Sequence, residues 1–339
     1  MKHLFGIFIP LCICSFIAFG ISVAILGVES SAAFDGDTDT ADNSWTRTIE
    51  REYSDIDIDA GWLAVKIIPA DTDITTIKYD GHSAGSDIVT EVKGDTLKVD
   101  AGTFVSFMGI DKLIDNIVNG IKNGFMFDFA EASLEITVPD KVYRKLDISE
   151  GSGNITVNGI EAREYDFDIG SGALYFTGGD WTAELLDLDH GAGYFSLENV
   201  RTEKYDIDVG SGTFDISGLT GKGKFSMGSG TGTLGFGNVN GNSEIDIGSG
   251  SLTVELPSDT NAVITADIGS GSVRVNACGK NTALVDKQKV TLGDGGYEIN
   301  TDLGSGRVRF VEADSAGSTT DEYEEAVVTT GIAVAVEMP

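Results

Sequence analysis

A glycine triplet that returns about every 20 residues constrains this chain more than any other feature. The sequence is Gly-Ser-Gly, or once Gly-Ala-Gly, and it begins at Gly151, Gly170, Gly191, Gly210, Gly228, Gly248, Gly269 and Gly304. Successive starts are 19, 21, 19, 18, 20, 21 and 35 residues apart. Self-similarity at this period is typical of stacked repeat architectures. The last interval then holds one period plus an insertion.

Residues on both sides of each triplet alternate between apolar and polar, the period-two pattern of a half-buried β-strand. Phe167 and Ile169 precede one triplet, and Leu174 and Phe176 follow it. The apolar positions therefore change from odd to even numbers across the glycines. This change requires a bend, and glycine supplies backbone freedom for it. Each unit is expected to contain a strand, a glycine corner, a second strand and a polar turn.

The turns also share a pattern, in which an Asn or Gly precedes an apolar residue. Asn and Gly suit tight turns, and we expect the apolar residue to fill the corner of the core. The apolar residues concerned are Ile160, Val200, Leu219 and Val239.

A unit of two short strands cannot bury its apolar face alone, whereas stacked units can. The expected fold is all-β, a single-stranded β-solenoid over residues 47–312, with coils of about 20 residues and Gly-Ser-Gly corners. The alternative is a glycine-rich antiparallel sandwich, although consecutive hairpins would not need the same triplet each time. Ile56–Val65 is expected to form a degenerate first coil. Further strands are expected at Thr75–Tyr79, Ile88–Val92, Thr96–Val99 and Ser133–Val138.

The N-terminal segment is apolar enough to enter a membrane. Leu4–Val28 is uncharged, and as a helix it would span ~37 Å, enough for a ~30 Å hydrocarbon core. Residues 1–33 are therefore expected to be a transmembrane anchor, with a cleaved signal segment as the alternative because Ser31-Ala32-Ala33 offers a cleavage site. Lys2 before the run and acids from Glu29 onward place the bulk of the chain outside the cytoplasm. Cleavage would instead make the protein secreted.

Three other segments depart from the repeat pattern. Residues 34–46 are interpreted as a linker. Apolar residues between Ile110 and Ile121 form one helical stripe, so an amphipathic helical insertion is expected near 106–124. Residues 313–339 are expected to form an acidic flexible tail.

The net charge and the absence of known motifs exclude several classes of function. The formal net charge is −31, from 54 acidic and 23 basic residues, which argues against nucleic-acid binding. The sequence contains no phosphate-binding loop and no nucleophile elbow. No cofactor is expected. His190 occupies a position where other repeats have Ile169 or Val209, so it is interpreted as a core substitution.

One constellation could carry chemistry. Six aspartates share the position two residues before a triplet: Asp168, Asp189, Asp208, Asp246, Asp267 and Asp302. If the coils stack, their side chains form a column with a spacing of about 4.8 Å. They could cap the glycine corner by accepting backbone N–H bonds. They could instead bind calcium through carboxylate oxygens, although calcium needs six to eight oxygen ligands.

The chain resembles the bacterial putative-adhesin family of β-strand-repeat proteins, a toast-rack-type domain of unknown function. The resemblance rests on Leu134–Pro139, Tyr143–Ile148 and Gly151–Ile155, and on Asp168–Gly172 with its successors. It covers roughly Ile49 to Val311. It implies a repetitive β-fold and an N-terminal membrane segment, and it supplies no active-site residues.

Three functions follow as hypotheses. The first is a non-catalytic extracytoplasmic domain for adhesion, scaffolding or envelope sensing, whose partners would be the membrane and a cell-envelope polymer or membrane protein. The second is a polysaccharide-acting β-solenoid enzyme, which would need Arg or Lys beside acids in a cleft. Among the arginines of the repeats, Arg274, Arg307 and Arg309 lie in the last units. The third is a calcium-binding structural module.

Overall fold

The computed structural model describes residues 44–81, 88–101 and 132–313. These residues form 25 β-strands, and no helix among them could span a bilayer. The expected membrane segment, the insertion near 106–124 and the tail beyond Ala313 lie outside the described residues. The all-β expectation is confirmed.

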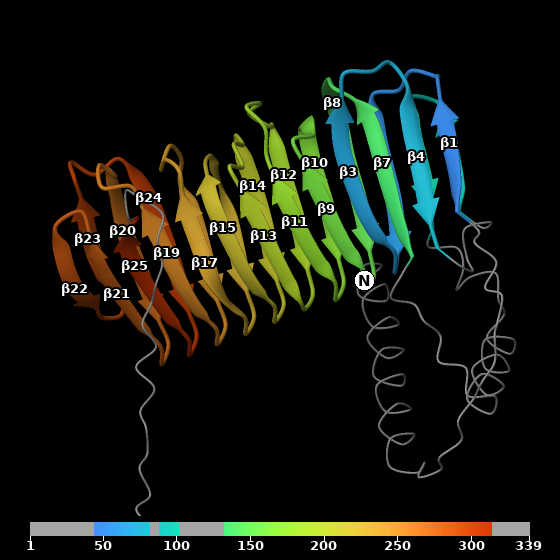
Figure 1. Cartoon of the computed structure of the whole chain (residues 1–339). Coiled ribbons are helices and arrows are strands. Elements are labelled where there is room, and N and C mark those ends of the chain that lie inside the picture. The colour runs from blue at the N-terminus through green and yellow to red at the C-terminus, as the bar shows by residue number, and fades with distance from the viewer. Residues whose placement is uncertain (1–43, 82–87, 102–131, 314–339) are drawn as a thin grey trace, which may run out of the picture.

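Two long sheets stack the strands of successive coils side by side (Figure 1). In spatial order, sheet A contains β1 (Trp45–Ile49), β4 (Thr75–Asp80), β7 (Ser133–Pro139), β3 (Ala64–Ala70), β9 (Asn154–Asn158), β11 (Ala173–Thr177), β13 (Tyr194–Glu198), β15 (Thr213–Leu219), β17 (Thr231–Phe236), β19 (Ser251–Leu256), β25 (Arg307–Glu312), β21 (Ser272–Ala277) and β22 (Lys280–Leu284). Sheet B contains β23 (Lys289–Leu292), β20 (Ala262–Ile268), β24 (Tyr297–Leu303), β18 (Ser243–Ile247), β16 (Lys222–Met227), β14 (Lys204–Val209), β12 (Leu185–His190), β10 (Glu161–Ile169), β8 (Val142–Glu150), β2 (Asp55–Gly61), β6 (Thr96–Asp100) and β5 (Val89–Lys93).

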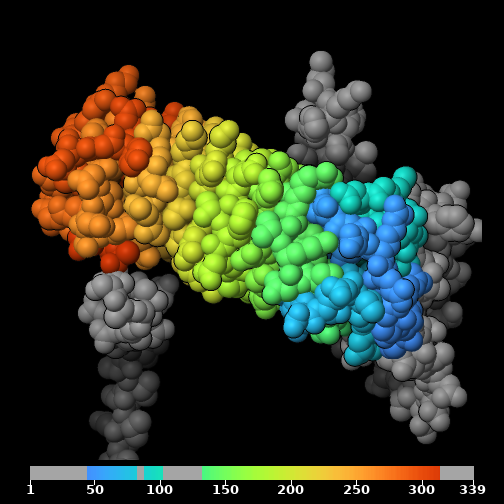
Figure 2. All heavy atoms as spheres, turned by 90° about the horizontal axis from the view of Figure 1, so that it is seen from above, coloured from blue at the N-terminus to red at the C-terminus, as the bar shows by residue number. Residues whose placement is uncertain are grey.

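Each coil contributes one strand to sheet B and, after the glycine corner, one strand to sheet A. Neighbouring coils pair in parallel, as β10 does with β12 and β11 with β13. The coils therefore build an elongated solenoid rather than a sandwich of hairpins (Figure 2).

Apolar side chains from both sheets fill the space between them. Phe167, Ile169, Leu174 and Phe176 are all buried, so the inward positions change parity across the glycines as the pattern predicts. The four apolar turn residues are buried too: Ile160, Val200, Leu219 and Val239.

The coils do not stack in chain order at either end. The first coil, β2–β3, lies between β8–β9 and the strands β6 and β7. The last coil, β24–β25, inserts between β18–β19 and β20–β21. Antiparallel strands finish the stack, β1, β4 and β5 at one end and β22 and β23 at the other. These short antiparallel strands limit the parallel edges that could recruit another chain.

Glycine is required at the corners mainly by close approach rather than by an unusual backbone conformation. Of the triplet glycines, only Gly193 has a left-handed φ, at 126°. At Gly248, a Cβ atom would lie 2.6 Å from the carbonyl oxygen of Gly228 in the neighbouring coil. The amide of Ser249 donates to that same carbonyl at 2.8 Å. A side chain at this glycine would push the two coils apart.

The inward-facing position just before the triplet is polar in two of the repeats. Glu150 and His190 point inward, 4% and 2% exposed, and in the described part of the chain neither carboxylate oxygen nor ring nitrogen has a hydrogen-bond partner. Both pair in register with Ile169, one on each side. Burial raises the pKa of Glu150 to about 8, and the nearby Ser152 amide opposes this only in part. Burial lowers the pKa of His190. Both side chains therefore favour their neutral forms in the fold.

Gly248→Ala should destabilise the solenoid by about 1–3 kcal/mol, because overpacking forces the backbone to shift. Thermal unfolding followed by circular dichroism measures the effect. Ser249→Ala is the matched control, since the chain itself has Ala192 at the equivalent place. Equal midpoints for the two variants would contradict the close-approach argument.

Glu150→Gln should flatten the pH dependence of stability. In the unfolded chain this carboxyl ionises near its ordinary pKa of 4.5, but in the fold it keeps its proton up to about pH 8. The folded state therefore binds more protons between these values, and the free energy of unfolding falls as pH rises through that window. The difference between wild type and variant isolates Glu150 from the opposite effect of His190. We expect the variant to gain on the order of 3 kcal/mol relative to wild type between pH 5 and pH 8. Denaturant unfolding at both pH values measures this, and a constant difference would exclude the effect.

Candidate binding surfaces

The outer face of sheet B carries the aspartate column that the sequence predicts. Asp189 lies in register between Asp168 and Asp208. Beyond Asp208 the column is interrupted by Ser226 before Asp246. Because the last coil is inserted, Asp302 lies between Asp246 and Asp267. All six predicted residues thus share one face, in an order that differs from their order along the chain.

A second carboxylate column runs beside the first, and the sequence analysis missed it. It contains, in register, Asp57, Asp147, Asp166, Asp187 and Asp206. Asp-x-Asp pairs, such as the one formed by Asp187 and Asp189, are the signal that could have revealed it, because residues two apart on a strand share a face. The two columns are called the acidic face below.

Repulsion within the acidic face is only partly relieved by lysines. Lys145 bridges Asp147 and Asp166 at 2.8 and 2.6 Å, and Lys224 contacts Asp246 at 2.8 Å. Partial burial raises the pKa of Asp187, and the charges of Asp166, Asp206 and Asp208 raise it further.

The pKa of Asp189 is raised in the same way, by partial burial first and then by Asp208, Asp187 and Asp168. The three central strands β10, β12 and β14 therefore hold the most crowded carboxylates of the column.

The structure bears on both interpretations of the aspartate column, the corner cap and the calcium site. A cap is present at the first coil, where the Gly61 amide donates to Asp59 Oδ1 at 3.2 Å. For the six predicted aspartates, the described residues contain no such bond to the corner backbone. The described residues also bring together no group of three or more acidic, histidine or cysteine side chains able to hold a metal ion. Calcium binding by Asp168, Asp208, Asp246, Asp267 or Asp302 stays a prediction.

A groove of about 480 Å³ follows the glycine corners of the four coils at the C-terminal end. It is lined by Ser229, Gly230, Thr231, Ser249, Gly250, Ser251, Ser270, Gly271, Ser272, Ser305, Gly306 and Arg307. Its serine and threonine residues are exposed to solvent. Its volume falls within the range of ~300–1,000 Å³ typical of ligand sites.

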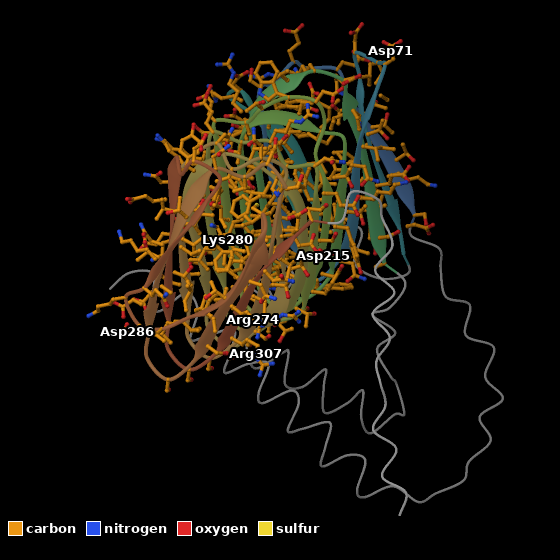
Figure 3. All side chains as sticks on the ribbon, turned by 90° about the vertical axis from the view of Figure 1, so that its left-hand side faces the viewer. Asp71, Asp215, Arg274, Lys280, Asp286 and Arg307 are labelled. Atoms are coloured by element: carbon orange, nitrogen blue, oxygen red, sulfur yellow. The ribbon has the colours of Figure 1, made fainter. Side chains whose placement is uncertain are left out.

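Three arginines lie beside this groove on the outer face of sheet A. Arg307 lies in register between Ser251 and Ser272, and Arg309 lies next to Arg274. Figure 3 shows Arg274 and Arg307 close together near the end of the solenoid. The Arg274 guanidinium donates to the side-chain oxygen of Asn281 at 3.0 Å. In the parts of the chain that the structure describes, no carboxylate comes within ion-pair distance of any of the three.

The groove lining consists of glycine, serine and threonine residues and Arg307. Glycoside cleavage requires a pair of positioned carboxylates or an equivalent acid and base. The residues that line the groove include no carboxylate, histidine, lysine or tyrosine. The arginines expected for a polysaccharide-acting enzyme therefore lie close together, whereas the two aspartate columns lie on the opposite sheet.

Asp187→Asn should stabilise the protein by a few tenths of a kcal/mol at low salt, because it removes one of several crowded like charges. The gain should shrink at high salt, where exposed charges are screened. Thermal melts at two salt concentrations measure it. Asp215→Asn is the control, since Asp215 lies between Ser196 and Thr233 on sheet A. An equal gain in the control would show that net charge, not the column, is responsible.

Comparison with solved structures finds similar chains at low sequence identity. A "putative lipid binding protein" from Parabacteroides distasonis is 16% identical, with 79% of this chain and 97% of that one covered and a TM-score of 0.49. A "putative adhesin" from Bacteroides fragilis is 14% identical, with 79% and 97% covered and a TM-score of 0.38. A "putative cell adhesion protein" from Clostridium sporogenes is 16% identical, with 80% and 100% covered and a TM-score of 0.25.

No curated protein sequence matches the chain. The sequence profile of one family, Toastrack DUF4097, matches residues 53–308, which include almost every strand from β2 to β25. The match spans the glycine corners, both sheets and the groove, and it agrees with the resemblance inferred from the repeats. The chain therefore belongs to the Toastrack DUF4097 family.

Proposed function

We propose that the protein is a non-catalytic extracytoplasmic surface domain that holds an envelope polymer or a membrane-protein partner against its solenoid. The observation that carries this proposal is the pair of ordered surfaces on opposite sheets, the acidic face on sheet B and the groove with its arginines on sheet A. Backbone hydrogen bonds join every coil to the next, so both surfaces are held in fixed register. A rigid scaffold of this kind binds without a large ordering cost.

The proposed location follows from the sequence. Leu4–Val28 would anchor the chain in the cell membrane by a single pass, with the solenoid outside the cytoplasm. Cleavage near Ala33 would release the same domain as a secreted protein. Either form would meet cell-envelope polymers, because both place the solenoid in that compartment.

A polysaccharide-acting enzyme is the alternative function, and the arginines beside the groove are the observation that favours it. Arg274, Arg307 and Arg309 could bind the acidic groups of a glycan, as such an enzyme requires. The groove lacks a carboxylate that could act as acid or base. We therefore assign the groove to binding.

The full-length protein in detergent should leave acidic and neutral polysaccharides at their original length after prolonged incubation. The physical reason is the missing acid and base in the groove. Size-exclusion chromatography and an assay for new reducing ends measure the outcome, with a known polysaccharide-degrading enzyme as the positive control. Shortened chains whose appearance is abolished by Arg274→Ser would replace this proposal with the enzymatic alternative.

A further inference from the structure

The three arginines beside the groove lie close together despite the repulsion between their charges. Arg309 and Arg274 lie directly opposite each other on β25 and β21, and like charges in this position destabilise a sheet. The chain has 54 acidic residues, yet none of those described forms an ion pair with Arg274, Arg307 or Arg309. This adjacency arises only because β25 inserts between β19 and β21. Cations kept close together, with no ion pair of their own among the described residues, indicate an anionic ligand on a chain of net charge −31.

Arg307 also breaks the pattern of its own position in the coil. The same place, the first residue of the sheet A strand, is occupied by Thr231, Ser251 and Ser272 in the other coils that line the groove. A serine there satisfies the fold, so the fold itself does not require a charged residue. Arg307 is exposed and lines the groove between two serine-bearing coils.

The groove offers many donors and acceptors in addition to this charge. Its serine and threonine side chains are exposed, and in the described residues none of their hydroxyls bonds to another protein group. Successive coils are spaced by about 4.8 Å, so the four rungs extend over roughly 14 Å. The groove is open and crosses the strands, so an extended molecule can lie along it.

We propose that this groove binds a linear anionic polysaccharide, with Arg307 contacting its carboxylate or phosphate groups and the serine hydroxyls contacting its sugar hydroxyls. The inference rests on the proposed non-catalytic binding function and names the ligand of one surface. Guanidinium groups form strong charge-assisted hydrogen bonds with both kinds of anion. A glycan fits better than an acidic peptide, because the groove lining has no aromatic or large apolar residue to receive a peptide side chain.

Binding is tested with the full-length protein in detergent, by calorimetric titration with an oligogalacturonate and with a maltooligosaccharide of equal length. The carboxylated chain should bind, with an affinity that falls as salt rises, and the neutral chain should bind far more weakly. Arg307→Ser introduces the residue that adjacent coils already use, and it should weaken binding roughly tenfold or more. Ser249→Ala combined with Ser305→Ala should also weaken binding while leaving the melting temperature unchanged.

Arg163→Ser is the matched control, because Arg163 is exposed on sheet B and pairs only loosely with Glu184, at 3.6 Å. It removes the same charge at a site remote from the groove. Equal weakening by Arg163→Ser and Arg307→Ser would reduce the effect to net charge and overturn the proposal. Equally tight, Arg307-dependent binding of polyglutamate would show that the groove takes acidic peptides. Absence of oligogalacturonate binding together with capture of another envelope component would refute the groove assignment alone and leave the proposed function standing.

Discussion

The hydrogen bonds that join one glycine corner to the next hold the coils at their spacing. The carbonyl of Gly228 accepts from the Ser249 amide, and that of Gly248 accepts from the Ser305 amide. These carbonyls occupy the space that a Cβ atom at the following triplet would need. Because the ladder continues through the bend, sheets A and B become one stacked structure whose register is fixed at every coil.

A fixed parallel register converts a repeated residue into a column. On sheet B this places aspartate beside aspartate, and their repulsion adds to partial burial in raising the pKa values of Asp187 and Asp189. On the inner side the same rule aligns apolar residues, and Glu150 and His190 are the exceptions. Both remain tolerable because burial favours their neutral forms. The core therefore tolerates these two polar residues because they are neutral, whereas ionised side chains at the same positions would be costly.

The order of the strands at the C-terminal end of the stack determines where the groove and its arginines lie. Inserting β24–β25 between earlier coils brings Arg307 and Arg309 next to residues about 35 positions earlier in the chain. The antiparallel strands β22 and β23 come from the long interval between the last two triplets. The same insertion that completes the end of the solenoid therefore creates the groove and its arginine cluster.

The strand-corner-strand unit, the inward residues such as Phe167 and Leu174, and the first aspartate column can all be predicted from the sequence, because they follow from local periodicity. The sequence also contains the second column as Asp-x-Asp pairs, such as Asp166 and Asp168. The order of the end coils, the pairing of Arg309 with Arg274 and the close approach at the glycine corners become visible only in the folded chain. These depend on which distant strands lie side by side, and a period along the chain carries no information about an exchange of neighbours.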